Sequence, residues 1–461
     1  MDRSLRELAS GLRSREFTSL DLLTESLEAL DTSEPRLNAY KLRTEDFARR
    51  AAERADAAFG AGSDAGMLQG IPVSVKDLYG VPGLPTFAGS ARQLPAKWEA
   101  AGPLVARLLH ESAVIVGKTH TVEFAFGALG VNHHWGTPRN PWDKARHRVP
   151  GGSSSGAAVS LCQGSAIIAL GSDTAGSVRL PASLTGNVGY KPTIDRWSTA
   201  GISPLSRIFD SPGLLTRSVD DVRAAACHLD SYAFGHPPGE LASFEPHALR
   251  IGVPEHFFWD DCDAGIVEGV RGALRELEKA GHKLVPVDFP QATRAFEVLR
   301  EGGTSGAELL AFLQHELPEW LRQLDPYIGI RMEGLAHITA VEFLRRKAAL
   351  EDLASEAIAV FDSVDVIASP TTPISPPLLE ELATWDQYRV LNQKMVRNSS
   401  IANLLRQCAL TMPVALDALG MPVGMQLMAA GGRDATLLGA GMAFEAALGN
   451  GRQRLGICPG R

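Results

Sequence analysis

Cysteine is scarce in this chain: there are five residues in 461, an odd number, and no Cys-x-x-Cys pair among them. A disulfide framework or a zinc site needs closely spaced cysteines, so we expect neither, and we expect the reducing environment of the cytoplasm. Long apolar runs are also missing. Ala166–Leu170 is a typical one, far shorter than the roughly 20 residues that span a bilayer. We therefore expect no membrane partner.

Positive charge is not in excess either. The chain has 45 Lys+Arg against 53 Asp+Glu, a net charge of −8, and no dense basic run. This balance argues against nucleic acid as a partner. The N-terminal stretch MDRSLRELASGLRSREF carries both charge signs and no apolar core, so it does not predict a secretory signal. A 45% hydrophobic content excludes a disordered chain and predicts a large folded core.

Helical and strand-like periods alternate along the chain. Ser19 is expected to cap a helix whose leucines at 20, 23, 27 and 30 share one face. Short apolar or β-branched runs predict strands between such helices. The expected helices are 19–30, 45–59, 104–109, 157–163, 266–280 and 341–361, and the expected strands are 71–75, 114–116, 166–170, 250–253, 283–287 and 364–368.

This alternation predicts an α/β fold, with one large domain built on a central mixed β-sheet that helices flank on both faces. Residues 1–60 are expected to be N-terminal helices. The stretch from about 290 to 360 has no strong strand pattern and is expected to be a mostly helical insertion. No linker or internal repeat divides the chain, so we expect residues 1–461 to form one domain.

Two Gly/Ser-rich segments, Pro150–Val159 and Gly171–Leu184, adjoin predicted strands. Glycines let backbone N–H groups crowd around a bound group, and a helix N-terminus adds positive potential for a developing oxyanion. The alternative is a turn that only allows close helix–sheet packing. A phosphate-binding loop is excluded, because Ala157 follows Gly156 where that loop has Lys.

The pattern G-x-S-x-G of α/β-hydrolases does occur at residues 152–156, with Ser154 as the formal nucleophile. That mechanism also needs a downstream acid and histidine. No downstream histidine has a distinctive context; the candidates are His228, His247, His282 and His337.

A lysine is the other candidate base. Lys76 directly follows a predicted buried strand, where desolvation would lower its pKa and leave an amine able to take a proton from serine. The alternative role is an ion pair with Asp77. Lys118 also follows a buried strand and is the rival base. Spacing alone leaves both lysines open.

Five segments in this order and spacing resemble the amidase signature family. They are Gly70–Leu78, Gly117–Ala128, Pro150–Val159, Gly171–Leu184 and Gly189–Ile194. The resemblance extends to Leu37–Tyr40, Val364–Ile374 and Gly420–Met428 and is weakest between about 230 and 340. It implies that residues 68–220 are the signature core of a large mixed sheet flanked by helices.

The resemblance also implies roles for individual residues. Lys76 matches the catalytic lysine, Ser153 the bridging serine, whose peptide bond is cis in the family, and Ser177 the nucleophile. The oxyanion hole would be made by the backbone N–H groups of Thr174, Ala175, Gly176 and Ser177. The implied acyl-enzyme mechanism uses no metal and no organic cofactor, and a homodimer is common in the family.

Three positions depart from the family pattern: Ser155–Gly156, Asp195 and Gly213–Leu214. None carries the implied chemistry, so only local turn geometry is in question. Asp173 and Arg179 flank the nucleophile; they are expected to form the frame of its loop, while a role for Arg179 in binding a substrate carboxylate stays open. Four aromatic residues are candidates either for an apolar acyl pocket or for the ordinary core, and none is assigned as a substrate ligand: Tyr79, Phe124, Phe126 and Trp135.

The predicted function is hydrolysis of the C–N bond of a small-molecule amide through a Ser-Ser-Lys acyl-enzyme, with release of ammonia or an amine. One alternative is an allophanate or carboxybiuret-type hydrolase, because Asn403–Leu410 is mildly similar to those enzymes. A second is the amidase subunit of a tRNA-dependent amidotransferase, although its Met-Tyr-x-x-Asp stretch is not seen. A binding protein on an inactive amidase fold is disfavoured, because Lys76, Ser153 and Ser177 are all present.

Overall fold

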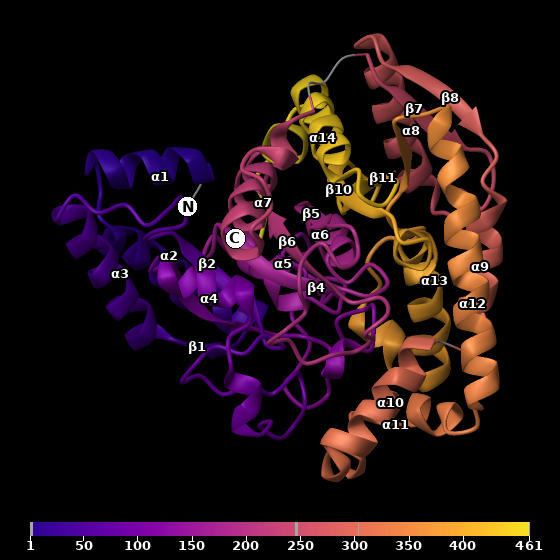
Figure 1. Ribbon diagram of the computed structural model, residues 1–461, viewed down its shortest axis with the longest axis horizontal. Coiled ribbons are helices and arrows are strands. Elements are labelled where there is room, and N and C mark those ends of the chain that lie inside the picture. Colours follow the sequence, from indigo (N-terminus) through magenta and orange to yellow (C-terminus); the bar gives the residue numbers. More distant parts are fainter. Residues whose placement is uncertain (1–2, 245–247, 303, 461) are drawn as a thin grey trace.

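Eleven strands form one mixed sheet in the computed structural model, which describes residues 3–244, 248–302 and 304–460 (Figure 1). Their order across the sheet is β1-β3-β2-β4-β6-β5-β10-β11-β9-β7-β8. The strands are β1 (Tyr40–Arg43), β2 (Pro72–Lys76), β3 (Val114–Thr119), β4 (Ile168–Asp173), β5 (Val188–Lys191), β6 (Ser211–Thr216), β7 (Arg250–Pro254), β8 (Lys283–Val287), β9 (Val366–Pro370), β10 (Cys408–Leu416) and β11 (Pro422–Ala429).

The sheet has two parallel parts joined by an antiparallel centre. Strands β3, β2 and β4 are parallel neighbours, and so are β8, β7 and β9. The pairs that join β4 to β9 through β6, β5, β10 and β11 are all antiparallel. The predicted single domain with a mixed sheet is therefore confirmed.

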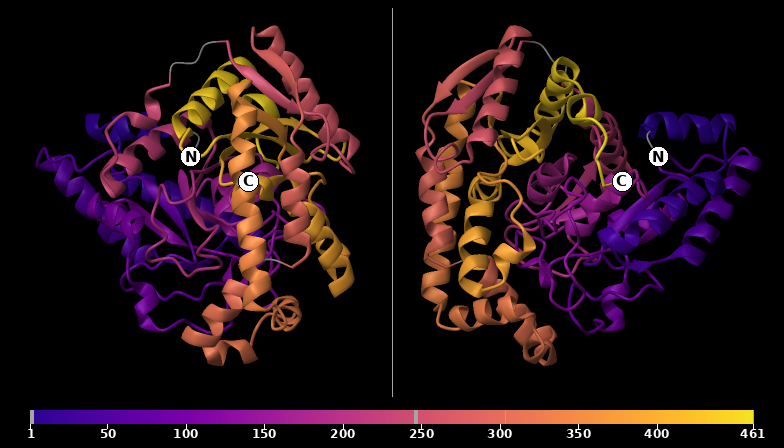
Figure 2. Two further views of the ribbon diagram at one scale, coloured as in Figure 1. Left: turned by 45° about the vertical axis from the view of Figure 1, so that its right-hand side comes forward. Right: turned by 180° about the vertical axis from the view of Figure 1, so that it is seen from behind.

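Helices lie around the sheet on both sides of the molecule, as Figure 1 and the two views of Figure 2 show. The indigo helices α1–α3 lie at one end, α9 and α12 lie at the other, and α10 and α11 lie at the bottom of the view. The described helices are α1 (Leu5–Ser14), α2 (Ser19–Leu37), α3 (Glu45–Gly60), α4 (Pro103–His110), α5 (Ser155–Gln163), α6 (Arg179–Thr185), α7 (Val219–Phe234), α8 (Ala264–Lys279), α9 (Pro290–Arg300), α10 (Thr304–Glu316), α11 (Pro326–Leu335), α12 (Ala340–Ala357), α13 (Trp385–Leu404), α14 (Asp434–Leu448) and α15 (Gly451–Leu455).

Alternating side chains of the central strands enter two different apolar clusters. In β11, Met425 and Leu427 belong to the largest cluster, whereas Met428 belongs to a second one with residues of α9, α12 and α13. In β10, Leu410 and Ala409 divide in the same way. Because successive strand residues point to opposite faces, the centre of the sheet is buried on both faces.

The strands that carry the candidate site differ from their predicted bounds. The apolar runs predicted strands at 71–75 and 166–170, but β2 includes Lys76, and β4 extends through Ser172 to Asp173. Val75 pairs with Leu170 in the parallel ladder, so pairing rather than local hydropathy sets where the strands end. Both strands therefore deliver polar side chains to the same edge of the sheet.

Two other expectations differ in detail. Thr18, not Ser19, caps α2: its side chain accepts a hydrogen bond from the Asp21 N–H, while the Ser19 hydroxyl donates to the Gly70 carbonyl. Residues 290–357 hold α9–α12, and no strand occurs among the described residues between β8 and β9. Within the described ranges, no helix has the length and apolar character needed to cross a membrane.

Candidate active site

Lys76, the last residue of β2, is completely buried. Its Nζ lies 2.8 Å from the Ser153 Oγ and 2.9 Å from the Ser172 Oγ. Burial lowers the pKa of Lys76 to about 7, against the opposing effect of nearby Asp210 and Asp173, which raise it. A large fraction of this amine is thus neutral near pH 7 and able to accept a proton.

Asp77, the alternative partner of Lys76, and Lys118, the alternative base, pair with each other. Asp77 does not pair with Lys76; the Lys118 Nζ lies 2.8 Å from its Oδ1. Lys118 also donates to the Thr86 Oγ1 at 2.6 Å. The structure therefore brings Lys76 to Ser153, and it places Lys118 in a buried ion pair.

Ser153 is buried at the end of the loop that leads into α5. The Gly152–Ser153 peptide bond is cis. The Gly152 N–H donates to the Ala128 carbonyl at 2.6 Å, and the Ser153 carbonyl accepts from the Val122 N–H at 3.3 Å. These backbone hydrogen bonds to the loop after β3 fix the position of Ser153, whose hydroxyl contacts the Lys76 amine.

Ser177 lies at the wall of a cavity of ≈ 420 Å³. The Ser154 N–H donates to the Ser177 carbonyl at 3.1 Å, which joins the two serine-bearing segments. The Ser177 side chain has no hydrogen-bond partner among the described residues, and the residue retains 6% exposure. Its hydroxyl can therefore meet a small molecule in the cavity, whereas Lys76 and Ser153 are fully buried and do not line the cavity.

Asp173 holds the loop that carries Ser177. Its carboxylate accepts hydrogen bonds from the N–H groups of Gly176 at 2.8 Å and Val178 at 3.1 Å. It also accepts from the Arg179 Nη2 at 2.9 Å. Burial alone would raise the pKa of Asp173, but the Arg179 guanidinium brings it well below its usual range. The carboxylate is therefore ionised and ties both sides of the loop together.

Arg179 is fully buried, and its remaining donors are used by the protein. Nη1 donates to the Ser399 carbonyl at 2.8 Å and to the Gln426 side chain, and Nη2 donates to the Asn403 Oδ1 at 2.6 Å. Arg179 does not line the cavity. Of the two roles considered for it, the structure supports the frame of the loop, not a contact with substrate.

One predicted oxyanion donor needs correction. The Gly176 N–H already donates to the Asp173 carboxylate, so it is not free to meet an oxyanion. Among the described residues, the N–H groups of Thr174, Ala175 and Ser177 have no protein acceptor. Thr174, Ala175 and Ser177 also line the cavity. These three amides are the donors that the geometry leaves available.

Two residues near the Lys76 amine, Ser172 and Asp210, were not predicted from the sequence. Ser172 became visible only when β4 proved longer than its apolar run. Asp210 accepts from the Thr174 Oγ1 at 2.5 Å and from the Leu205 and Ser206 N–H groups, and burial raises its pKa to about 6. A single carboxylate in the otherwise uncharged stretch 208–214 was the available signal.

The α/β-hydrolase interpretation has no support. Ser154 is buried, and its Oγ contacts the Ser172 carbonyl at 3.3 Å. No described histidine side chain bonds to it. The His228 ring pairs with Glu111, and the His282 ring accepts from the Leu249 N–H. His247 lies outside the described residues.

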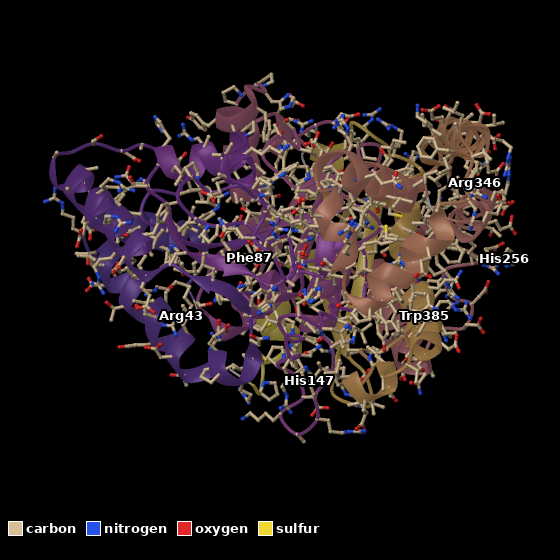
Figure 3. All side chains as sticks on the ribbon, turned by 90° about the horizontal axis from the view of Figure 1, so that it is seen from below. Arg43, Phe87, His147, His256, Arg346 and Trp385 are labelled. Atoms are coloured by element: carbon tan, nitrogen blue, oxygen red, sulfur yellow. The ribbon has the colours of Figure 1, made fainter. Side chains whose placement is uncertain are left out.

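Much of the cavity wall comes from the helices α9, α11 and α13. Phe126 is the one cavity residue among the four aromatic candidates, while Tyr79 and Phe124 lie in the core. Sequence reasoning missed Trp385 and Tyr388 of α13, which also line it. Figure 3 shows Trp385 among the orange and yellow helices, on the opposite side of the molecule from Arg43.

Comparisons with known proteins identify the family of the chain. The family model described as Amidase matches residues 21–438. The chain belongs to the amidase family. It is an enzyme of the class that hydrolyses amide C–N bonds.

Individual relatives cover nearly the whole amidase chain. It is 50% identical to 2-amino-5-chloromuconic acid deaminase of Comamonas testosteroni, over 98% of each chain. It is 32% identical to one of the subunits of the glutamyl-tRNA(Gln) amidotransferase of Anaeromyxobacter dehalogenans (strain 2CP-C), over 96% of each. A solved structure reported as "Crystal structure of amidase" superposes with a TM-score of 0.86 at 29% identity, covering 97% of this chain and 100% of that one.

Proposed function

We propose that this amidase cleaves the C–N bond of a small-molecule amide through an ester intermediate on Ser177. The observation that carries the proposal is the buried Lys76 Nζ 2.8 Å from the Ser153 Oγ, in a setting that lowers the Lys76 pKa to about 7. The cavity beside Ser177 has a volume of ≈ 420 Å³, within the range of small-molecule sites.

The proposed reaction moves one proton in and out along the same path. Neutral Lys76 takes the proton of Ser153 as Ser153 takes that of Ser177, whose Oγ then attacks the carbonyl carbon. The N–H groups of Thr174, Ala175 and Ser177 stabilise the oxyanion. The proton returns to the nitrogen, which leaves as ammonia or an amine, and water then hydrolyses the ester to release the acid and free Ser177.

The test is ammonia release by the purified chain from aliphatic, aromatic, carboxylated and urea-like amides. Ser177→Ala should lose about 10⁴-fold or more in kcat, and Lys76→Ala about 10²- to 10⁴-fold. Ser183→Ala is the matched control, because the Ser183 hydroxyl is buried without a hydrogen-bond partner in the described structure. Near-normal turnover by Ser177→Ala would remove the mechanism.

Deamination of a small amino acid is a second candidate, favoured by the 50% identical relative named as a deaminase. Amide hydrolysis forms an acyl ester on Ser177, whereas deamination forms no acyl-enzyme. Added hydroxylamine intercepts an acyl-enzyme and yields a hydroxamate, whereas removal of an amino group from a non-acyl carbon yields none. Hydroxamate formation would therefore favour the amide, and ammonia release without it would favour deamination.

The amidotransferase alternative is tested by the same assay, because ammonia release by the isolated chain needs no partner protein. Selective turnover of the urea-like amides would favour the allophanate-type alternative. We also propose a cytoplasmic enzyme, which the five free thiols fit, and a homodimer as in other family members. The division into residues 1–60, 68–220 and 290–360 stays a proposal, supported by the position of α9–α12.

A further inference from the structure

The cavity beside Ser177 has a marked charge asymmetry. Three arginines line it: Arg300 at the end of α9, Arg331 on α11 and Arg389 on α13. Among the described lining residues there is no aspartate and no glutamate. The charged side chains that line the cavity are therefore all cationic, although the chain as a whole carries a net charge of −8.

Arg331 is the arginine that the protein holds most firmly. Its guanidinium lies 3.4 Å from the centroid of the Phe126 ring, and its Nη1 donates to the Phe126 carbonyl. Phe126 precedes Ala128, whose carbonyl binds the Gly152 N–H next to Ser153. The guanidinium is thus packed on the same loop that positions the candidate catalytic serine, with donors left for another group.

Nothing in the described protein neutralises Arg331. It makes no ion pair with any described carboxylate, and burial lowers the pKa of its guanidinium. The adjacent polar group is the phenol of Tyr388, whose pKa burial raises to about 12, so it is uncharged near pH 7. A desolvated cation without a counter-charge is unfavourable, and the open side of this one faces the cavity where substrate would bind.

We infer that Arg331 binds a carboxylate of the substrate, so that the amidase acts on small amides that carry a carboxylate at the end away from the scissile bond. This inference rests on the proposed function for the identity of the reacting end. Guanidinium and carboxylate form paired, charge-assisted hydrogen bonds. Arg300 and Arg389, which are exposed and unpaired within the described structure, favour the approach of the anion.

The test uses matched ligands that differ by one group. ω-Carboxyl amides with two, three or four methylenes are compared with the corresponding neutral diamides, by calorimetric binding to the Ser177→Ala protein. At least one carboxylate should bind about 10-fold or more tightly than its diamide. Arg331→Gln should abolish that preference and leave diamide binding unchanged, and Arg331→Lys should restore part of it.

Arg294→Gln is the control, because Arg294 lies on α9 outside the cavity and pairs with Glu356; it should keep the preference. Equal binding of both ligands, no measurable binding of any carboxylate, or a preference that survives Arg331→Gln would overturn the inference. If Arg331→Gln weakened the binding of the carboxylate and of the diamide equally, Arg331 would have only a structural role, and this would also overturn the inference. Since binding is measured without turnover, a carboxylate preference in a protein that releases no ammonia would instead remove the proposed function.

Discussion

Lys76 has two hydroxyl groups, and no carboxylate, within hydrogen-bond distance of its amine. This environment is suited to a base, because nothing stabilises the ammonium form enough to offset burial. Lys118 is buried to a similar degree but has a carboxylate 2.8 Å away. The two lysines therefore differ in their hydrogen-bond partners. The hydroxyl partners of Lys76 suit a base, and the carboxylate partner of Lys118 suits an ion pair.

The pH dependence of turnover follows from the charge state of Lys76. The base acts when neutral, so kcat/KM should rise with pH through a midpoint near the Lys76 pKa of about 7 and level off above it. Asp210 is one of the groups that raises this pKa. Asp210→Asn should therefore move the midpoint to lower pH, by on the order of one unit.

The matched control is Asp195→Asn, because Asp195 is exposed, pairs with Arg406 and is not one of the carboxylates that raise the Lys76 pKa. Normalised pH profiles of the three proteins give the answer. A midpoint that stays in place, or that moves to higher pH in Asp210→Asn, would show that Lys76 is not the group that titrates.

At the residue scale, the sequence was sufficient to select the candidate catalytic residues but not to assign their hydrogen bonds. Order and spacing of the motifs singled out Lys76, Ser153 and Ser177, and the structure brings Lys76 to Ser153 and joins the backbones of the two serine-bearing segments. The motifs did not predict that the Gly176 N–H donates a hydrogen bond to the Asp173 carboxylate. Which donor meets which acceptor depends on the path of the loop, and that path is set by contacts with distant residues.

The loop after β4 is the structural element on which the site depends most. Gly176 adopts φ +117°, and a Cβ at this position would lie 2.1 Å from the Ser399 Oγ on α13. The loop and α13 therefore approach more closely than any side chain at position 176 would allow. We expect this contact to fix the loop whose three free amides belong to residues that line the cavity.

Gly176→Ala should displace the loop and lower kcat by about 10²-fold or more, since misplacing reacting groups by around 1 Å has that effect. Gly281→Ala is the matched control: Gly281 has φ +99° and open space around its Cβ position, so it carries the backbone cost of roughly 1–3 kcal/mol without the clash. Steady-state assays and urea unfolding separate the two effects. Equal kcat in both variants would contradict the role assigned to this contact.

Helices and strands could be predicted from the sequence where a local hydropathy pattern or a glycine marks their ends. Helix α8 ends one residue before the expected position, and Gly281 follows it with a positive φ. The strands β5, β6, β10 and β11 were not predicted from periodicity. They pair with one another in the buried centre of the sheet, where both faces are apolar and the alternation that marks a half-exposed strand is lost.

At the scale of the whole molecule, the site is assembled from two distant parts of the sequence. Lys76 ends β2, Ser153 precedes α5 and Ser177 follows β4, whereas the three cavity arginines come from α9, α11 and α13. Figure 1 shows α9 at the other end of the molecule from α1–α3. No motif marked that helical region in the sequence, so the chemistry of the reaction could be predicted from sequence and the charge of the cavity could not.

The central claim is that Ser177 is the nucleophile and that Lys76 activates it through Ser153. Peptide mapping of a fluorophosphonate adduct by mass spectrometry tests this most directly. Ser177 should be phosphonylated in the unmodified protein, and its labelling should be slower by about 10²-fold or more in Lys76→Ala and in Ser153→Ala. An adduct on Ser154, or labelling of Ser177 that is equally fast without the Lys76 amine, would contradict it.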